Sequence, residues 1–99
     1  MPKMNEESMN GSTSIEKVLQ AIEDSPVKVG QHWRHYKGEV YVIHGFAINE
    51  PTTDPLVLYY RDGLANVITD GVVPWSRRLS DFRGYVEGAR LRFTIVETK

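Results

Sequence analysis

Residues 39–48, EVYVIHGFAI, are the most strand-like stretch of this sequence. They are dense in β-branched and aromatic side chains, which favour a pleated strand. Alternate side chains of a strand point to opposite faces. One face is therefore expected to carry Val40, Val42, His44 and Phe46, and the other Tyr41, Ile43 and Ala47. Both faces are largely apolar, which is typical of a strand that is covered on both sides.

Other strand-like runs follow, separated by short turns. The runs are PLVLYY (55–60), LANVIT (64–69), VVPW (72–75) and LRFTIVE (91–97). Lys37-Gly38, Asp62-Gly63, Asp70-Gly71 and Glu87-Gly88 are predicted as turns, because glycine accepts a positive φ without a steric penalty. No βαβ spacing is present, since the one predicted helix precedes every strand. The pattern predicts a mainly β fold, an antiparallel barrel of five or six strands.

An amphipathic helix is predicted before the strands. The sequence TSIE (13–16) is typical of a capping box, in which Thr13 and Glu16 satisfy free backbone N–H groups. Apolar residues then recur on one helical face, at Ile15, Val18, Leu19 and Ile22. We expect these side chains to be buried, against the rest of the domain or a second copy of the protein. The predicted organisation is a flexible tail at 1–12 and one domain at 13–99, with the helix at 13–24 and the barrel at 27–98.

Composition narrows the class of protein. The chain has 99 residues, 40% of them hydrophobic, and a formal net charge of −1. This charge argues against a general nucleic-acid coating protein, which would be strongly basic. The absence of cysteine excludes disulfides and thiolate sites. No secretion signal and no membrane-spanning run are recognised, so a cytoplasmic protein without membrane contact is expected.

Motifs for catalysis and metal binding are weak. His32 and His35 would point to opposite faces of a strand, which splits a potential metal-binding pair. No nucleophile elbow and no phosphate-cradling glycine loop occurs in the sequence. A histidine–carboxylate site assembled by the fold stays open, but no metal or cofactor is expected. An enzyme is disfavoured and not excluded.

Two clusters indicate a binding surface instead. If residues 31–37 (QHWRHYK) are extended, each side carries a ring beside a cation: His32, Arg34 and Tyr36 on one, Trp33, His35 and Lys37 on the other. A ring can stack on a planar ligand while a cation meets its acidic group. The alternative is that the rings are core and the cations only face water. The second cluster is PWSRRLSDF (74–82), in which Trp75 and Phe82 are expected to be core and Arg77 shares a face with Trp75.

The order of these motifs resembles a small bacterial and phage family, a conserved domain of unknown function. The resemblance rests on HYKGEVYVIHGFA (35–47), PLVLYY (55–60), WSRRLSDF (75–82) and VEGARLRF (86–93), and covers roughly residues 29–93. It implies a barrel of the SH3-like kind. The positions that match the family pattern are His35, Tyr36, Lys37, Gly38, Tyr41, Gly45, Ala47, Tyr59, Trp75, Arg77 and Phe82. Departures are Trp33 in place of tyrosine, Asn49-Glu50-Pro51 in place of His-Ser-Glu, and Arg78 in place of proline.

The predicted function is a non-catalytic binding module. Its ligand would be small, polar and anionic, such as a nucleotide or a nucleotide-derived signal that the protein sequesters. The predicted ligand-binding residues are Arg34, His35, Tyr36, Lys37, Tyr41, Tyr59, Trp75 and Arg77. Two alternatives stay open: a module that binds a peptide or partner protein, or its own copy through the helix, and a single-stranded nucleic-acid binder.

Overall fold

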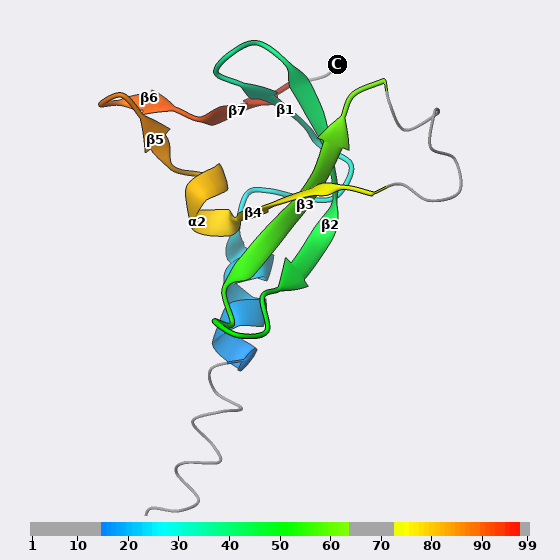
Figure 1. The fold of residues 1–99 in the computed structure, drawn as a ribbon, viewed down its shortest axis with the longest axis vertical. Coiled ribbons are helices and arrows are strands. Elements are labelled where there is room, and N and C mark those ends of the chain that lie inside the picture. The colour runs from blue at the N-terminus through cyan, green and yellow to red at the C-terminus, as the bar shows by residue number, and fades with distance from the viewer. Residues whose placement is uncertain (1–14, 64–72, 98–99) are drawn as a thin grey trace, which may run out of the picture.

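The computed structural model describes residues 15–63 and 73–97 (Figure 1). A helix at 15–24 precedes the strands. The later elements are β1 (His32–His35), β2 (Val40–Ile48), β3 (Pro55–Arg61), β4 (Trp75–Arg78), α2 (Leu79–Phe82), β5 (Tyr85–Val86), β6 (Arg90–Leu91) and β7 (Phe93–Val96). The mainly β prediction is confirmed. The predicted tail, the run 64–69 and the Asp70-Gly71 turn lie outside the described residues.

The strands form one five-stranded sheet and a separate hairpin. The sheet has the order β4-β3-β2-β1-β7, and β5 pairs with β6. Every neighbouring pair is antiparallel. Within residues 15–63 and 73–97 no pairing joins β4 to β7, so this ladder has two edge strands. No helix in the described ranges is long and apolar enough to cross a membrane.

A β-bulge in β2 changes which side chains reach the core. Ile43 pairs with Tyr59, but the next partners are Gly45 and Leu58, so His44 is an extra residue. A bulge inserts one residue and inverts the alternation beyond it. Phe46 consequently pairs with the fully buried Val57 and packs against the core. The expectation that Phe46 shares a face with Val40 and Val42 is therefore wrong.

The core lies between the sheet and α2. Its buried members are Val27, Trp33, Ile43, Val57, Tyr59, Leu79, Phe82 and Phe93. Phe82 of α2 stacks on Phe93 of β7, with ring centroids 4.0 Å apart and planes 7° from parallel. Phe82 is core as predicted. Trp75 is not, because it begins an edge strand and is 64% exposed.

The N-terminal helix is less buried than the segment that follows it. Figure 1 shows it at the end of the sheet where β3 begins. Just beyond it, Ser25 is buried and its Oγ accepts the N–H of Val27, which is fully buried. Ile15 and Leu19, however, are 40% and 52% exposed. The prediction of a buried helical face is wrong for these two residues, while Val18 and Ile22, on the same face, are half-buried.

Candidate ligand-binding site

The candidate site forms where the ends of five strands meet. β1 and β3 end here and β2, β4 and β7 begin here, because neighbouring strands run antiparallel. Side chains from all five strands surround a cavity of about 170 Å³. Its lining residues are His35, Tyr41, Tyr59, Trp75, Arg77 and Phe93. Among the described residues, the wall therefore consists of aromatic rings and one guanidinium.

The turn between β1 and β2 holds His35 at the cavity. Gly38 has a φ of +113°, which favours glycine, and its N–H donates to the carbonyl of His35 at 2.7 Å. The N–H of His35 donates to the carbonyl of Glu39, also at 2.7 Å. The N–H of Tyr36 donates to the carbonyl of Arg92 at 2.8 Å. These bonds tie the turn to the chain that enters β7.

The imidazole of His35 is held as a neutral ring. Its Nδ1 accepts the backbone N–H of Lys37 at 3.1 Å, so the neutral ring carries its proton on Nε2. Partial burial lowers the pKa of His35 below 6.5, and the positive charges of Arg77, Lys37 and Arg92 lower this pKa further. At neutral pH the ring therefore offers an Nε2–H donor rather than a positive charge.

The lowered pKa of His35 predicts a pH dependence of stability. In the unfolded chain His35 takes up a proton near its ordinary pKa of 6.5, and in the folded chain only at lower pH. Below pH 6.5 the unfolded state binds more protons, so the free energy of unfolding should fall as pH falls toward the folded-state pKa. Denaturant titrations between about pH 8 and about pH 5 measure this fall.

The matched variant for this prediction is His35→Asn. Its amide oxygen can accept the Lys37 N–H, but the side chain does not titrate. His32 and His44 stay in both proteins and supply a common background. The fall in stability below pH 6.5 should be smaller in the variant. Identical pH profiles of wild type and His35→Asn would show that His35 titrates alike in both states.

Arg77 is the cation of the cavity. Its Nε donates to the phenol oxygen of Tyr59 at 3.2 Å, and its Cζ lies 5.9 Å from the ring centroid of Phe93. No carboxylate in the described parts of the chain forms an ion pair with Arg77. The terminal guanidinium nitrogens can therefore donate to an acidic group of a ligand.

Glu39, which adjoins the cavity through its bond to Tyr41, is already engaged. Glu39 accepts the phenol O–H of Tyr41 at 2.9 Å, and its other oxygen lies 3.4 Å from Arg61. Burial and the bond to Glu39 raise the pKa of Tyr41 above 10.0, so this phenol stays uncharged. Among the described residues that line the cavity, the charged side chain is therefore the cation Arg77.

A second group of cations adjoins the cavity beyond His35. The ring of Tyr36 lies 4.5 Å from that of His35, centroid to centroid. Lys37 Nζ and Arg90 Cζ each lie 5.9 Å from the Tyr36 centroid. We call Tyr36, Lys37 and Arg90 the basic ledge.

Comparison with known proteins places these features in a family. The model of DUF1653, a family described as proteins of unknown function, matches residues 31–94. The chain belongs to the DUF1653 family. A crystal structure of a DUF1653 protein from Bordetella bronchiseptica is similar, with 30% sequence identity and a TM-score of 0.53, covering 72% of this chain and 88% of that one. No curated protein matches.

In this DUF1653 chain the predicted site residues divide into three groups. His35, Tyr41, Tyr59, Trp75 and Arg77 line the cavity. Tyr36 and Lys37 belong to the basic ledge, because β1 ends at His35 and Lys37 lies in the turn rather than on the strand. Arg34 is outside both groups, since its guanidinium is exposed and donates to the carbonyl of Gly38 at 3.0 Å.

Phe93 and Arg90 are site residues that the sequence did not single out. Phe93 is the last residue of the run VEGARLRF, which carries part of the family resemblance, and it lines the cavity. Its place in this run, after the Glu87-Gly88 turn, was the sequence feature that pointed to it. Arg90 reaches Tyr36 from β6, a strand far along the chain, and no spacing in the sequence indicates that contact.

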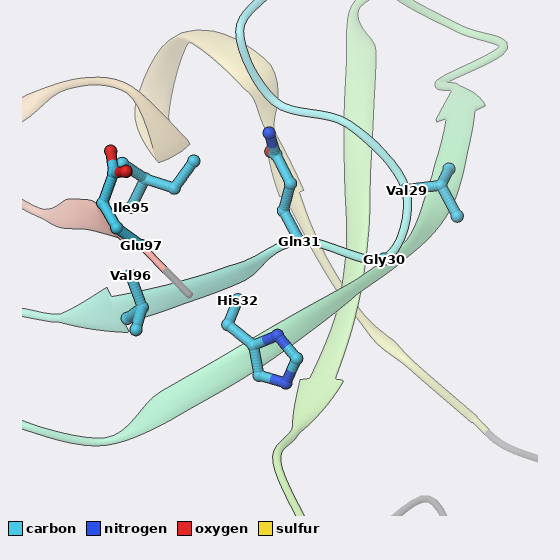
Figure 2. Close-up of a pocket in the computed structure, with 7 residues that line it drawn as sticks. All are labelled: Val29, Gly30, Gln31, His32, Ile95, Val96 and Glu97. Atoms are coloured by element: carbon cyan, nitrogen blue, oxygen red, sulfur yellow. The ribbon is translucent and has the colours of Figure 1, made fainter. Parts of the chain in front are cut away.

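A larger hollow at the other end of β1 lacks convergent polar groups. It has a volume of about 480 Å³ and is lined by Val29, Gly30, Gln31, His32, Ile95, Val96 and Glu97 (Figure 2). Figure 2 shows the side chains of Gln31 and His32 pointing to opposite sides of the chain where β1 begins. Gln31 Oε1 already accepts the N–H of Lys28 and the indole N–H of Trp33. In the described ranges no three His, Asp or Glu side chains are grouped to hold a metal ion.

Proposed function

We propose that this DUF1653 protein is a non-catalytic binding module for a small planar anion, most concretely a nucleotide or a nucleotide-derived signal. The observation that carries the proposal is Arg77, whose guanidinium lies in a cavity otherwise walled by aromatic rings. Rings stack on a planar group without strong sequence or base preference, and a guanidinium binds a carboxylate or phosphate through paired N–H donors. Sequestration of a nucleotide signal needs only this binding.

The fold in this proposal is an open form of the small SH3-like barrel. β4 and β7 are the two edges of the sheet, yet Arg77 of β4 lies over the ring of Phe93 of β7. Contact between opposite edges requires a strongly curled sheet. The curl supports the proposal, because it makes the end of the sheet concave and gives the ligand a wall on each side.

The proposed binding is tested by calorimetric titration with a panel of nucleotides. Arg77→Ala should weaken binding about 10- to 150-fold, the equivalent of about 1.5–3 kcal/mol for a charge-assisted hydrogen bond. The matched control is Arg78→Ala. Arg78 is the next residue of β4, is not among the residues that line the Arg77 cavity, and pairs with Asp81 at 3.2 Å. Its loss should leave affinity unchanged.

Unfolding curves of both arginine variants complete this test. Neither change should alter the melting temperature much, because partly exposed charges contribute little to stability. If wild type and Arg77→Ala bind the ligand with equal affinity, Arg77 does not contribute to binding. An equal loss in both variants would attribute the effect to net charge.

A protein-interaction module is the second candidate function. The observation that favours it is the edge strand β7, whose neighbourhood exposes Ile95 and Leu91 at 41% and 39%. An extended peptide can add to such an edge as a further strand. The exposed Ile15 and Leu19 offer a second apolar surface, which could pair with another copy of the chain. A protein-interaction module would bind its partner equally well with and without nucleotides.

A single-stranded nucleic-acid binder differs from both candidates, because its affinity would fall steeply as the salt concentration rises.

A further inference from the structure

The volume of the cavity limits how much of a ligand it can hold. Pockets that enclose whole drug-sized ligands usually measure roughly 300–1,000 Å³. The cavity around Arg77 has about 170 Å³ and can hold one ring system. On the proposed function, the remainder of a nucleotide must therefore lie outside, against a neighbouring surface.

We infer that the ligand carries a chain of two or more phosphates, and that the basic ledge of Tyr36, Lys37 and Arg90 binds it. This inference rests on the proposed function and extends it from a planar anion to a nucleoside di- or triphosphate, or a ligand with an equivalent phosphate chain. The ledge adjoins the cavity through the neighbouring rings of His35 and Tyr36, whose centroids are 4.5 Å apart and whose planes are tilted by 35°.

The two cations of the ledge are held but not neutralised. Each lies 5.9 Å from the centroid of Tyr36, a contact that positions the charge while leaving N–H groups for a further partner. Among the ion pairs of residues 15–63 and 73–97, none includes Lys37 or Arg90. Both side chains are exposed.

The backbone holds together the two segments that carry these cations. Lys37 lies in the β1–β2 turn and Arg90 in β6. The bond from the Tyr36 N–H to the Arg92 carbonyl, at 2.8 Å, joins these segments. The positive charges of Arg77 at the cavity and Lys37 on the ledge both lower the pKa of His35, while Glu39 opposes them. A phosphate chain that leaves the cavity past His35 would therefore pass from one of these cations to the other.

The test compares phosphate number in wild type and variants at one salt concentration. Calorimetric titrations use the common nucleosides, their mono-, di- and triphosphates, and inorganic tripolyphosphate. In wild type the affinity should rise roughly tenfold or more from mono- to triphosphate. The Lys37→Ala/Arg90→Ala double variant should abolish that rise and the binding of tripolyphosphate. Arg77→Ala should weaken mono- and triphosphates by a similar factor.

The control is the Lys28→Ala/Arg83→Ala double variant, which removes the same charge from exposed positions outside the ledge and the Arg77 cavity. It should keep the wild-type rise. If the affinity of wild type does not rise with phosphate number, or if the rise persists in the ledge variant, the basic ledge does not bind a phosphate chain. Either result would leave the proposed role of Arg77 and its cavity unaffected. If tripolyphosphate binds through the ledge but Arg77→Ala leaves all affinities unchanged, the proposed function is wrong while phosphate binding by the ledge is supported. If wild type binds none of these compounds, both are overturned.

Discussion

Phe82→Ala is expected to destabilise the fold by about 3–5 kcal/mol. Phe82 is fully buried, stacks on Phe93 and meets the rings of Trp33 and Tyr59 edge-on, each with centroids 5.5 Å away. Removing its ring leaves a void between α2 and the sheet that the four-residue helix cannot fill without leaving its hydrogen bonds. Denaturant titration measures the loss as a lower midpoint at unchanged slope.

Tyr85→Ala is the matched control for Phe82→Ala. Tyr85 lies three residues further along and is 61% exposed. Its replacement should change the free energy of unfolding by less than about 0.5 kcal/mol. Similar losses at the two positions would mean that α2 does not pack on the sheet in solution.

Trp33→Ala is the second change with a large expected effect, about 3–5 kcal/mol. Trp33 is 7% exposed and its indole N–H donates to Gln31 Oε1 at 2.9 Å. The same oxygen accepts the N–H of Lys28, so the indole also orders the chain between the helix and β1. Thermal or denaturant unfolding measures the effect.

Trp75 supplies the comparison within the same residue type. Because it is 64% exposed, Trp75→Ala should cost less than about 1 kcal/mol in stability. On the proposed function it should still weaken ligand binding, since Trp75 lines the cavity.

Fluorescence can distinguish the two tryptophans. Trp33→Phe leaves only the exposed indole of Trp75, and the emission of this variant should shift toward that of free tryptophan. A buried-type spectrum from that variant would contradict the placement of Trp75.

Local sequence patterns located two of the strands closely, because alternation and turn glycines act over a few residues. The run 39–48 contains β2 (Val40–Ile48), and the run 55–60 lies within β3 (Pro55–Arg61). The other runs fitted less well: β4 begins at the last residue of the run 72–75, and the run 91–97 is divided between β6 and β7. The expectation that the one helix precedes every strand is wrong, because α2 follows β4. Arg77 shares a face with Trp75, since both pair with buried residues of β3. The bulge at His44 was not predictable, because alternation continues through it in the sequence. The predicted burial of Ile15 and Leu19 was wrong for a related reason. Periodicity identifies an apolar helical face but does not show how much of the domain covers it.

The candidate site shows the same limit. The cluster at 31–37 and the motif around Arg77 were visible as ring-and-cation pairs, whereas their meeting depends on the curl of the sheet. Arg90 illustrates the limit most clearly, since its contact with Tyr36 joins residues that are 54 positions apart in the sequence. The match to DUF1653 begins at residue 31, so the segment it covers includes the cavity and the ledge but not the N-terminal helix.

The pairing of β1 with β7 has a consequence for the order of assembly. β1 to β4 are consecutive neighbours in the sheet, so three of its pairings join strands adjacent in sequence. The pairing of His35 with Phe93 instead joins the two ends of the strand series, and closing that longer loop has the higher entropic cost. Among the residues that line the cavity, Phe93 is also the last to be synthesised. The aromatic wall is therefore completed only when the C-terminal strand docks, and a ligand seated against Phe93 favours the docked state of that strand.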